Sequence, residues 1–316
     1  MHQTHTQSVH GVSEAGQRGR AYELQQRRYM PTISRILVPV DFSDRCLGMM
    51  PYVRAIAERY KAEIVLLHVV NPVYTIPPTA FSEPVLLPVP PWVFGEKTKE
   101  LERFAAPQLQ DLPVRRLVYE GDPETQIAAF VDQENVQLII MPTHGYGVLR
   151  RYLIGSVAAK ILNDVPCPVL TGVHMDTECP PVNIKLSNIV CAINLGPQSA
   201  DTLAWASRIS QDFEARLSII HVMPPVNPGL YVSFVAGLRQ ECEDLARKDV
   251  EKLEREVAAS SVSICIQEGD AADQVCSFAE AVGADLLVIG RGTHDGRLRT
   301  NAYAIVRQAP CPVLSV

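Results

Sequence analysis

The segment Arg35-Ile-Leu-Val-Pro-Val-Asp41 returns 153 positions further along the chain as Asn188-Ile-Val-Cys-Ala-Ile-Asn194. Four other short segments return with shifts of 144 to 153 positions: 64–69 as 217–222, 120–122 as 268–270, 138–140 as 286–288 and 166–170 as 310–314. Self-similarity at a nearly fixed spacing is the signature of a duplicated unit. The chain therefore consists mainly of two copies of one unit.

Each copy alternates short apolar runs with helical stretches. In the first copy we expect strands at 35–40, 63–70, 114–119, 137–141 and 168–172, and helices near 44–60, 96–108, 123–133 and 155–163. The strands are apolar throughout rather than at every second residue, which is typical of a parallel sheet covered by helices on both faces. The sequence therefore predicts an α/β fold of two tandem, Rossmann-like, doubly wound units.

The segments outside the two copies set the predicted boundaries. Residues 1–30 are rich in Gln, His, Ser, Gly and Arg and have no hydrophobic periodicity, so we expect a disordered tail. The segment 173–185 contains a proline pair, and we expect it to be a linker. The predicted domains are therefore 31–172 and 186–316.

The composition argues against several classes of protein. The chain has 316 residues, a net charge of −6 and 47% hydrophobic residues. These values favour a globular protein and argue against a nucleic-acid binder, since that role needs a basic surface. No apolar run reaches the ~18 residues of a membrane span, and the first thirty residues lack the apolar core of a secretory signal. The eight cysteines form no CxxC pair and several lie in apolar runs, so we expect reduced, buried thiols and a cytoplasmic protein.

A glycine-rich loop follows the fourth predicted strand of the first copy. Residues 141–156 read Met-Pro-Thr-His-Gly-Tyr-Gly-Val-Leu-Arg-Arg-Tyr-Leu-Ile-Gly-Ser, and a helix is predicted to begin near Gly155 and Ser156. Glycine lets a backbone approach a ligand closely, and a helix amino end offers N–H groups and a partial positive charge to a phosphate. Ser156 adds a hydroxyl donor. For Arg150 and Arg151 two roles remain open: contact with a triphosphate, or exposure to solvent.

Asp41 ends the first predicted strand, and His68 and Val69 end the second. In a doubly wound sheet the carboxyl ends of the strands form the ligand crevice. A carboxylate at Asp41 can accept from a ribose hydroxyl or an adenine amine, and the Val69 backbone can meet the adenine edge. We therefore interpret this region as a nucleotide-phosphate site. The alternative is an ordinary glycine-rich turn in which Asp41 caps the next helix.

These residues resemble the universal stress protein family. The opening strand of its nucleotide-binding members ends in Val-Asp-x-Ser, which Val40-Asp41-Phe42-Ser43 matches. Their loop reads G-x2-G-x9-G-[S/T], and Gly145, nine residues, then Gly155 and Ser156 match its later part. Three further motifs fit: Leu67-His68-Val69, Gly121-Asp122 and the closing Pro-Cys-Pro-Val of each copy.

The resemblance covers about 33–172 and 186–316 and implies more than the residues alone. It implies a five-stranded parallel sheet in each unit, of the adenine nucleotide alpha hydrolase-like kind, with ATP, alone or with Mg²⁺, between strands one and four. The residues that it assigns to the adenosine are Asp41 and Val69, and those that it assigns to the phosphates are Gly145, Gly155 and Ser156.

The two copies depart from the family pattern to different degrees. In the first, Pro142 stands where the family loop has its first glycine; proline has no N–H group, so a contact there is lost or changed, and we expect the site to remain usable. In the second, Asn194 replaces the opening carboxylate and Arg299 falls where Gly155 lies. We therefore expect one nucleotide-competent half and one degenerate half.

The resemblance implies a stress-response regulator that binds ATP in its first unit and contacts a protein partner according to nucleotide occupancy. The alternative is a nucleotide-independent interaction scaffold, with the proline-rich segment 71–95 as its contact surface. The chain contains no S-G-G-x-D-S, H-I-G-H or HExxH string and no Walker lysine. We therefore assign no catalytic residue and expect at most slow ATP hydrolysis or autophosphorylation. His68 and His221 end matching strands, so we expect each to make a structural hydrogen bond.

Three expectations concern packing. We expect the segment 71–95 to pack aromatic side chains over the sheet or on a partner: Tyr74, Phe81, Trp92 and Phe94. A helix around 238–257 is expected to turn one stripe to the core: Cys242, Ala246, Val250, Leu253 and Val257. The resemblance implies an intrachain pseudo-dimer through the last strands, Pro168–Gly172 and Pro312–Val316, and leaves a homodimer open.

Overall fold

The computed structural model describes residues 32–75, 85–87, 89–144, 154–172, 183–225, 232–257, 262–292 and 300–316. The described residues of both repeats belong to one compact unit, Ile33–Val316. The predicted tail and most of the predicted linker lie outside the described residues. Their expected character therefore stays a prediction.

The first repeat alternates strands and helices as the sequence predicted. Its elements are β1 (Arg35–Pro39), α2 (Asp44–Gly48), α3 (Met50–Tyr60), β2 (Glu63–Val70), β3 (Val73–Thr75), β4 (Val85–Leu87), α4 (Pro91–Arg103), β5 (Val114–Glu120), α5 (Pro123–Glu134), β6 (Leu138–Pro142), α6 (Ser156–Asp164) and β7 (Val169–Gly172). The two short strands β3 and β4 pair with each other in a separate antiparallel hairpin.

The second repeat follows the same order without that hairpin among its described residues. Its elements are β8 (Asn188–Ile193), α7 (Ser199–Asp212), β9 (Arg216–Met223), α8 (Val232–Val257), β10 (Val262–Glu268), α9 (Ala271–Ala281), β11 (Leu286–Ile289), α10 (Thr300–Gln308) and β12 (Val313–Ser315).

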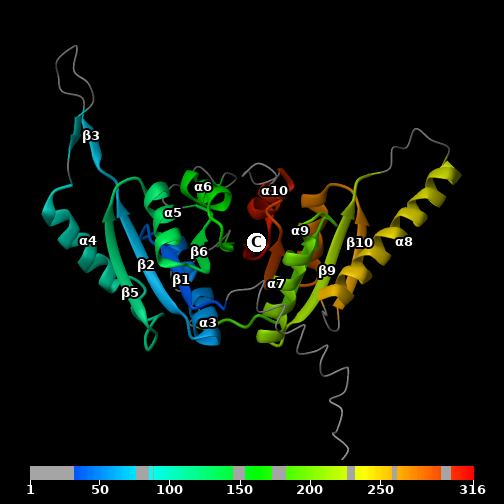
Figure 1. The fold of residues 1–316 in the computed structure, drawn as a ribbon, viewed down its shortest axis with the longest axis horizontal. Helices are drawn as coiled ribbons and strands as arrows, with labels where there is room; N and C mark the ends of the chain where they lie inside the picture. Colours follow the sequence, from blue (N-terminus) through cyan, green and yellow to red (C-terminus); the bar gives the residue numbers. More distant parts are fainter. Residues whose placement is uncertain are drawn as a thin grey trace, which may run out of the picture. The chain divides into compact units, whose positions relative to one another are not determined.

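Strands of both repeats form one ten-stranded sheet in the order β10-β9-β8-β11-β12-β7-β6-β1-β2-β5 (Figure 1). Within each repeat the five strands are parallel. The last strands of the two repeats, β7 and β12, pair antiparallel, with Leu170 opposite Leu314. The predicted α/β fold of two tandem doubly wound units is confirmed.

Glu-Gly-Asp recurs because it ends a strand and starts a helix in both repeats. The glycines take left-handed φ values, 135° at Gly121 and 145° at Gly269, which residues with a side chain rarely adopt. The aspartates then cap the helices: Asp122 accepts from the Thr125 N–H at 2.9 Å, and Asp270 accepts from the Ala272 N–H at 2.9 Å. These caps satisfy N–H groups that have no acceptor within the helix.

Two predicted helix boundaries differ from the structure because of proline. The helix expected near 44–60 is divided at Met49, and Pro51 lies in the first turn of α3; a proline is accepted there but not inside a longer helix. The helix expected near 96–108 begins five residues earlier, at Pro91, and ends at Arg103.

Of the two positions predicted for the aromatic side chains of the proline-rich segment, over the sheet or on a partner, Trp92 does not take the first. Its side chain lies in the first turn of α4 and is 65% exposed. Phe94 is half-buried, while Phe81 and the side chain of Tyr74 lie outside what the structure describes. The exposed indole therefore does not cover the sheet.

The predicted stripe on α8 is correct except at its amino-terminal end. Ala246, Val250 and Val257 are buried and Leu253 is half-buried, but Cys242 is exposed. The cysteines in apolar strands and turns behave as predicted: Cys46, Cys167, Cys191 and Cys311 are free and buried.

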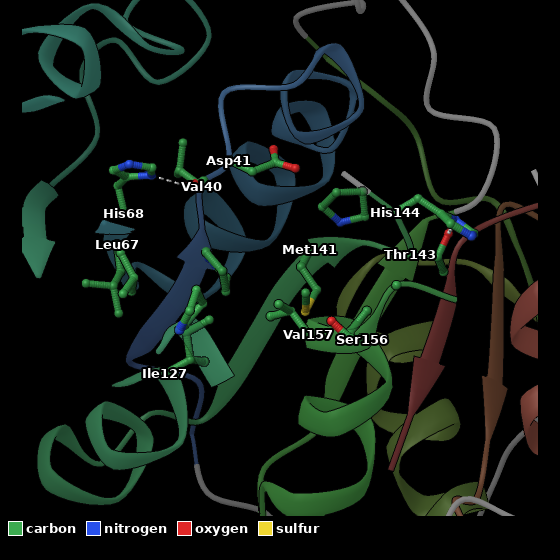
Figure 2. Close-up of a pocket in the computed structure, with 16 residues that line it drawn as sticks. Val40, Asp41, Leu67, His68, Ile127, Met141, Thr143, His144, Ser156 and Val157 are labelled. Atoms are coloured by element: carbon green, nitrogen blue, oxygen red, sulfur yellow. Dashed lines mark hydrogen bonds between the residues drawn. The ribbon is translucent and has the colours of Figure 1, made fainter. Parts of the chain in front are cut away.

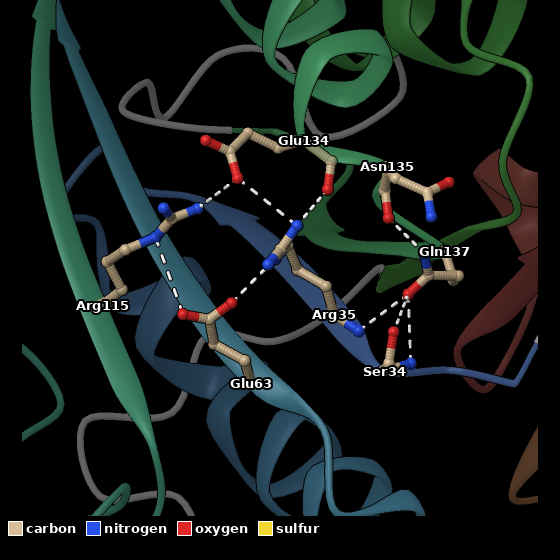
Figure 3. Close-up of polar contacts among 7 residues, drawn as sticks. All are labelled: Ser34, Arg35, Glu63, Arg115, Glu134, Asn135 and Gln137. Carbon is tan, nitrogen blue, oxygen red and sulfur yellow. Dashed lines mark hydrogen bonds and ion pairs between the residues drawn. The ribbon is translucent and has the colours of Figure 1, made fainter.

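A polar network joins the amino-terminal ends of three strands in the first repeat (Figure 3). Arg35 on β1 donates to Glu63 on β2 at 2.7 Å and also to the main-chain carbonyl of Glu134, which ends α5. Arg115 on β5 donates to the Glu134 carboxylate at 2.9 Å. This hydrogen bond is the main reason why the pKa of Glu134 lies below its usual value. The network therefore ties β1, β2 and β5 to α5, at the edge opposite the carboxyl ends of the strands.

Arg291, which follows β11, links the second repeat to the first. Its side chain is buried, and its guanidinium donates to the carbonyls of Val165 at 2.7 Å, Leu162 at 3.3 Å and Cys167. These carbonyls lie at and just after the carboxyl end of α6, where a positive charge is favourable. The contact therefore connects the loop after β11 with the helix that begins at Ser156.

Candidate functional site

A cavity of about 390 Å³ opens at the carboxyl ends of β1, β2 and β6. The first turns of α5 and α6 complete its wall. Figure 2 shows Asp41 on one side and Ser156 and Val157 on the other, with Met141 between them. This is the place at which doubly wound sheets hold ligands, and its volume lies in the usual range of ligand pockets, about 300–1,000 Å³.

Asp41 reaches the cavity because the next residue has an unusual backbone. Phe42 has a φ of 63°, a left-handed value that costs a residue with a side chain about 1–2 kcal/mol. The turn lets Asp41 Oδ1 accept from the Ser43 N–H at 3.0 Å and from the Ser43 hydroxyl at 2.7 Å. Both contacts use Oδ1, so Oδ2 is the carboxylate oxygen that can accept from a ligand.

Ser43 takes the capping role that was the alternative for Asp41. Its Oγ accepts from the Cys46 N–H at 3.2 Å and is the N-cap of α2. Asp41 does not cap the helix itself but orients Ser43 by accepting from its hydroxyl. The turn is therefore held by the chain itself, and one carboxylate oxygen remains for another partner.

His68 holds the end of β1 through a contact with the main chain. Its Nδ1 lies 2.7 Å from the carbonyl oxygen of Val40 (Figure 2). Because a carbonyl only accepts, Nδ1 carries the proton. Burial lowers the pKa of His68, against the opposing effect of the bond to Val40. His221 makes the same contact with Ile193 at 2.9 Å in the second repeat, which confirms the predicted structural role of both histidines.

Val69 offers main-chain groups to the cavity. β1 ends with Pro39 opposite Leu67, and the Val40 N–H donates to the Leu67 carbonyl at 2.8 Å. Along a strand, alternate residues direct their N–H and C=O groups to the same neighbour, so Val69 directs both groups to the side of β1, beyond the end of that strand. The backbone of Val69 therefore lies at the cavity with hydrogen-bonding groups that β1 does not cover.

The amino end of α6 supplies donors, although not all the expected ones. The Gly155 N–H is already used, because it donates to the Thr143 carbonyl at 2.9 Å. Gly155 is the N-cap and has no side chain to cap the first turn. The N–H groups of Ser156, Val157 and Ala158 have no acceptor within the helix. Gly155 therefore contributes a close approach rather than a donor, and the sequence reasoning missed Val157 and Ala158.

Pro142 is accommodated without a break in the sheet. It ends β6 opposite Gly172 on β7, and the next residue, Thr143, donates its N–H to the Gly172 carbonyl at 3.1 Å. The Thr143 hydroxyl lies 3.0 Å from His144 Nδ1, and both residues line the cavity. Neither Thr143 nor His144 was a sequence candidate.

Four of the five predicted site residues line this cavity: Asp41, Val69, Gly155 and Ser156. The fifth, Gly145, lies outside the described residues, as do Arg150 and Arg151. Among the described residues that line the cavity, Asp41 is the only carboxylate. No group of three or more His, Cys, Asp or Glu side chains in the described part of the chain is arranged to hold a metal ion. An Mg²⁺ ion here would therefore need most of its ligands from phosphates and water.

No helix among the described residues is long and apolar enough to cross a membrane. The ten-stranded sheet and the cavity at its carboxyl edge define a tandem α/β protein of the doubly wound class. The family model named "Universal stress protein family" matches residues 32–171 and again 185–316. The chain belongs to the universal stress protein family.

Two relatives each match a stretch about as long as one repeat. A universal stress protein of Methanocaldococcus jannaschii is 28% identical over 144 residues, which are 43% of this chain and 79% of the relative. Universal stress protein A homolog 1 of Coxiella burnetii is 31% identical over 136 residues, 41% of this chain and 94% of the relative. A solved universal stress protein of Archaeoglobus fulgidus covers both repeats: it has a TM-score of 0.64 at 19% identity, over 91% of this chain and 97% of that one. This structural likeness shows the shared fold.

Proposed function

We propose that the first repeat binds ATP and that the chain acts as a cytoplasmic stress-response regulator whose contact with a protein partner depends on nucleotide occupancy. The observation that supports this most is the cavity in which an acceptor and a set of donors face each other. Asp41 lies on one side and the amino end of α6 on the other.

The two sides of the cavity suit the two ends of a nucleotide. Asp41 Oδ2 accepts from a ribose hydroxyl or the adenine amine, and the main-chain groups of Val69 pair with the adenine edge. The apolar wall between them, which includes Ile127 and Met141, contacts the flat ring. The α6 donors and the Ser156 hydroxyl meet the phosphates, where a helix amino end favours negative charge by about 0.3–1 kcal/mol.

The nucleotide can regulate partner binding if the partner contacts the edge of the sheet at which the nucleotide binds. A ligand shifts a protein toward the conformations that bind it best, and a partner that prefers those conformations then binds more tightly. We assign no catalytic residue, so in this proposal the nucleotide acts as a bound signal that is hydrolysed slowly at most.

The first experiment counts adenine nucleotide released by acid from gently purified protein, followed by calorimetric titration with Mg-ATP. We expect about one nucleotide per chain. Asp41→Ala removes the acceptor and should weaken ATP binding about tenfold, which corresponds to about 1.4 kcal/mol. Asn194→Ala is the matched control, because it changes the same position of the second repeat, and it should leave ATP affinity unchanged.

The regulatory part needs a separate readout in cells. Loss of stress protection in the Asp41→Ala strain supports nucleotide-dependent regulation. Full protection by a variant that no longer binds ATP in vitro would instead support the nucleotide-independent scaffold. Purified protein without nucleotide that also gives no heat on titration with Mg-ATP would overturn ATP binding itself.

A further inference from the structure

The second repeat has a cavity at the position that corresponds to the first. Its volume is also about 390 Å³, and it opens at the ends of β8, β9 and β11, beside the first turns of α7, α9 and α10. The sequence predicts a degenerate nucleotide site here, largely from Arg299, which lies outside the described residues. The sequence changes between the repeats have therefore altered the lining of the cavity without filling it.

The apolar wall of the cavity is retained. Val222, Val275 and Ile289 line it, at the positions that Val69, Ile127 and Met141 occupy in the first repeat. Such a wall suits a flat ring. The half of the site that would contact a base is thus kept.

The carboxylate of the first cavity has no counterpart in the described lining of the second. Asn194 stands in place of Asp41, and no described residue that lines this cavity has an ionisable side chain. Asn194 Oδ1 accepts from the Gly196 N–H at 2.9 Å and from the Ser199 hydroxyl at 3.2 Å. With Oδ1 engaged, the side chain offers its amide N–H₂ as a donor where Asp41 offers an acceptor.

A glutamine side chain uses a main-chain donor of the loop that follows β11. The Gly292 N–H, in the loop that follows β11, donates to Gln198 Oε1 at 2.8 Å. Thr202 lies beside the same loop: a Cβ added to Gly290 would come within 2.8 Å of Thr202 Oγ1, so the loop approaches α7 closely at this glycine. Main-chain N–H groups in such loops are the usual donors to phosphate. Here the protein's own carboxamide satisfies one of them.

We propose that this second cavity binds an uncharged ligand of the nucleoside class, a heteroaromatic ring with a hydroxylated sugar and no phosphate. The retained wall contacts the ring, and neutral amides and hydroxyls meet the polar edge. A phosphate at the loop after β11 would have to displace Gln198 from the Gly292 N–H. The inference rests on the second cavity alone and does not require ATP in the first.

Two matched variants separate the cavities in the full chain. Pro123 and Ala271 occupy equivalent positions at the starts of α5 and α9, and each lines its own cavity. Pro123→Phe fills the first and Ala271→Phe fills the second. Calorimetric titrations with adenosine, AMP and ATP are expected to show that the Pro123→Phe chain binds one adenosine, at least about tenfold more tightly than AMP or ATP. The doubly filled chain should bind none.

The parent and Ala271→Phe chains give a test that does not depend on Pro123→Phe folding. The parent should bind one more adenosine per chain than Ala271→Phe. Equal adenosine stoichiometry in these two folded chains would overturn the inference, and so would a Pro123→Phe chain that binds AMP as tightly as adenosine. Failure of ATP to bind the Ala271→Phe chain would count against the proposed function only.

Gln198→Ala, made in the Pro123→Phe chain, tests the role of the carboxamide. Freeing the Gly292 N–H should raise AMP affinity about tenfold relative to adenosine, because hydrogen bonds to charged groups are the stronger ones. Gln211→Ala is the control: Gln211 lies in α7, the helix that follows Gln198, and its side chain donates to Ser207 Oγ at 3.2 Å. An AMP affinity that Gln198→Ala leaves unchanged would overturn this role of the carboxamide.

Discussion

Phe42 and Leu195 are equivalent residues with left-handed backbones, φ 63° and 56°, directly after Asp41 and Asn194. Neither position is a glycine, so the sequence carries no signal for this turn. The turn nevertheless decides which oxygen of Asp41 has no contact with Ser43, because it brings Ser43 to Oδ1. The identity of the site residue was predictable, since Asp41 ends a recognisable strand. Its free oxygen was not, because that depends on a local bond which the residue pattern does not encode.

The histidine that holds this turn makes stability depend on pH. Burial lowers the pKa of His68 in the folded chain, so between the folded value and the unfolded value of about 6.5 only the unfolded chain binds the proton. The stabilisation is complete above pH 6.5 and is lost as the pH falls through that value toward the folded pKa. We expect His68→Gln to show a smaller loss of stability than the parent between pH 8 and 5.5, measured by urea unfolding.

His68→Gln also removes the hydrogen bond to Val40, and a second variant measured at pH 8 separates that loss from the pH effect. His221→Gln removes the equivalent bond to Ile193, so its loss of stability at pH 8 gives the cost of losing such a bond. Parallel pH profiles of the parent and His68→Gln chains would show that His68 does not contribute to the acid sensitivity.

At the scale of elements, the strands were the most predictable part. Continuous apolar runs fix them within one residue, as at 63–70, which is β2. The helix boundaries were less predictable near proline, because a proline can either begin a helix or interrupt one. Pro91 begins α4, and Pro51 follows the break at Met49. The start of α6 was predicted, but the use of the Gly155 N–H by Thr143 was not, because that bond crosses a loop of more than ten residues.

The Asp270 cap is the element whose contribution is most directly measurable. Its carboxylate accepts from the Ala272 N–H at 2.9 Å and the Asp273 N–H at 3.1 Å. Asp270→Ala should lower the free energy of unfolding by about 1 kcal/mol, the usual effect of losing an N-cap. Asp270→Asn keeps an acceptor and should cost much less. Urea denaturation of the two variants checks this, and equal losses would show that charge rather than capping matters.

At the scale of the whole molecule, the buried Arg291 makes the two repeats depend on each other. Arg291→Ala leaves the carbonyls of Leu162, Val165 and Cys167 without this donor, and we expect a loss of about 2–3 kcal/mol in the free energy of unfolding. Arg255→Ala is the control, because Arg255 is exposed on α8. A loss no larger than that of the control would contradict the linking role, for which neither the repeat pattern nor the motifs gave a signal.

A homodimer, which the sequence left open, has to use a surface other than the last strands. β7 and β12 already pair with each other, and the outer strands of the sheet are β5 and β10. We expect that a dimer, where it forms, survives substitutions on β7 and β12 that leave the chain folded. Light scattering that gives a mass near 34.9 kDa at all concentrations would exclude a homodimer.

The antiparallel pairing of β7 with β12 also bears on how the chain can evolve. In a symmetric pair of identical chains, every substitution appears on both sides of the axis, so neither pocket can change without the other. Here the two halves are encoded separately, and their ratio stays one to one at any dilution. Each half is free to accumulate its own substitutions. Asn194, which aligns with Asp41 of the first repeat, is one example; in a symmetric pair of identical chains the same change would have altered both pockets.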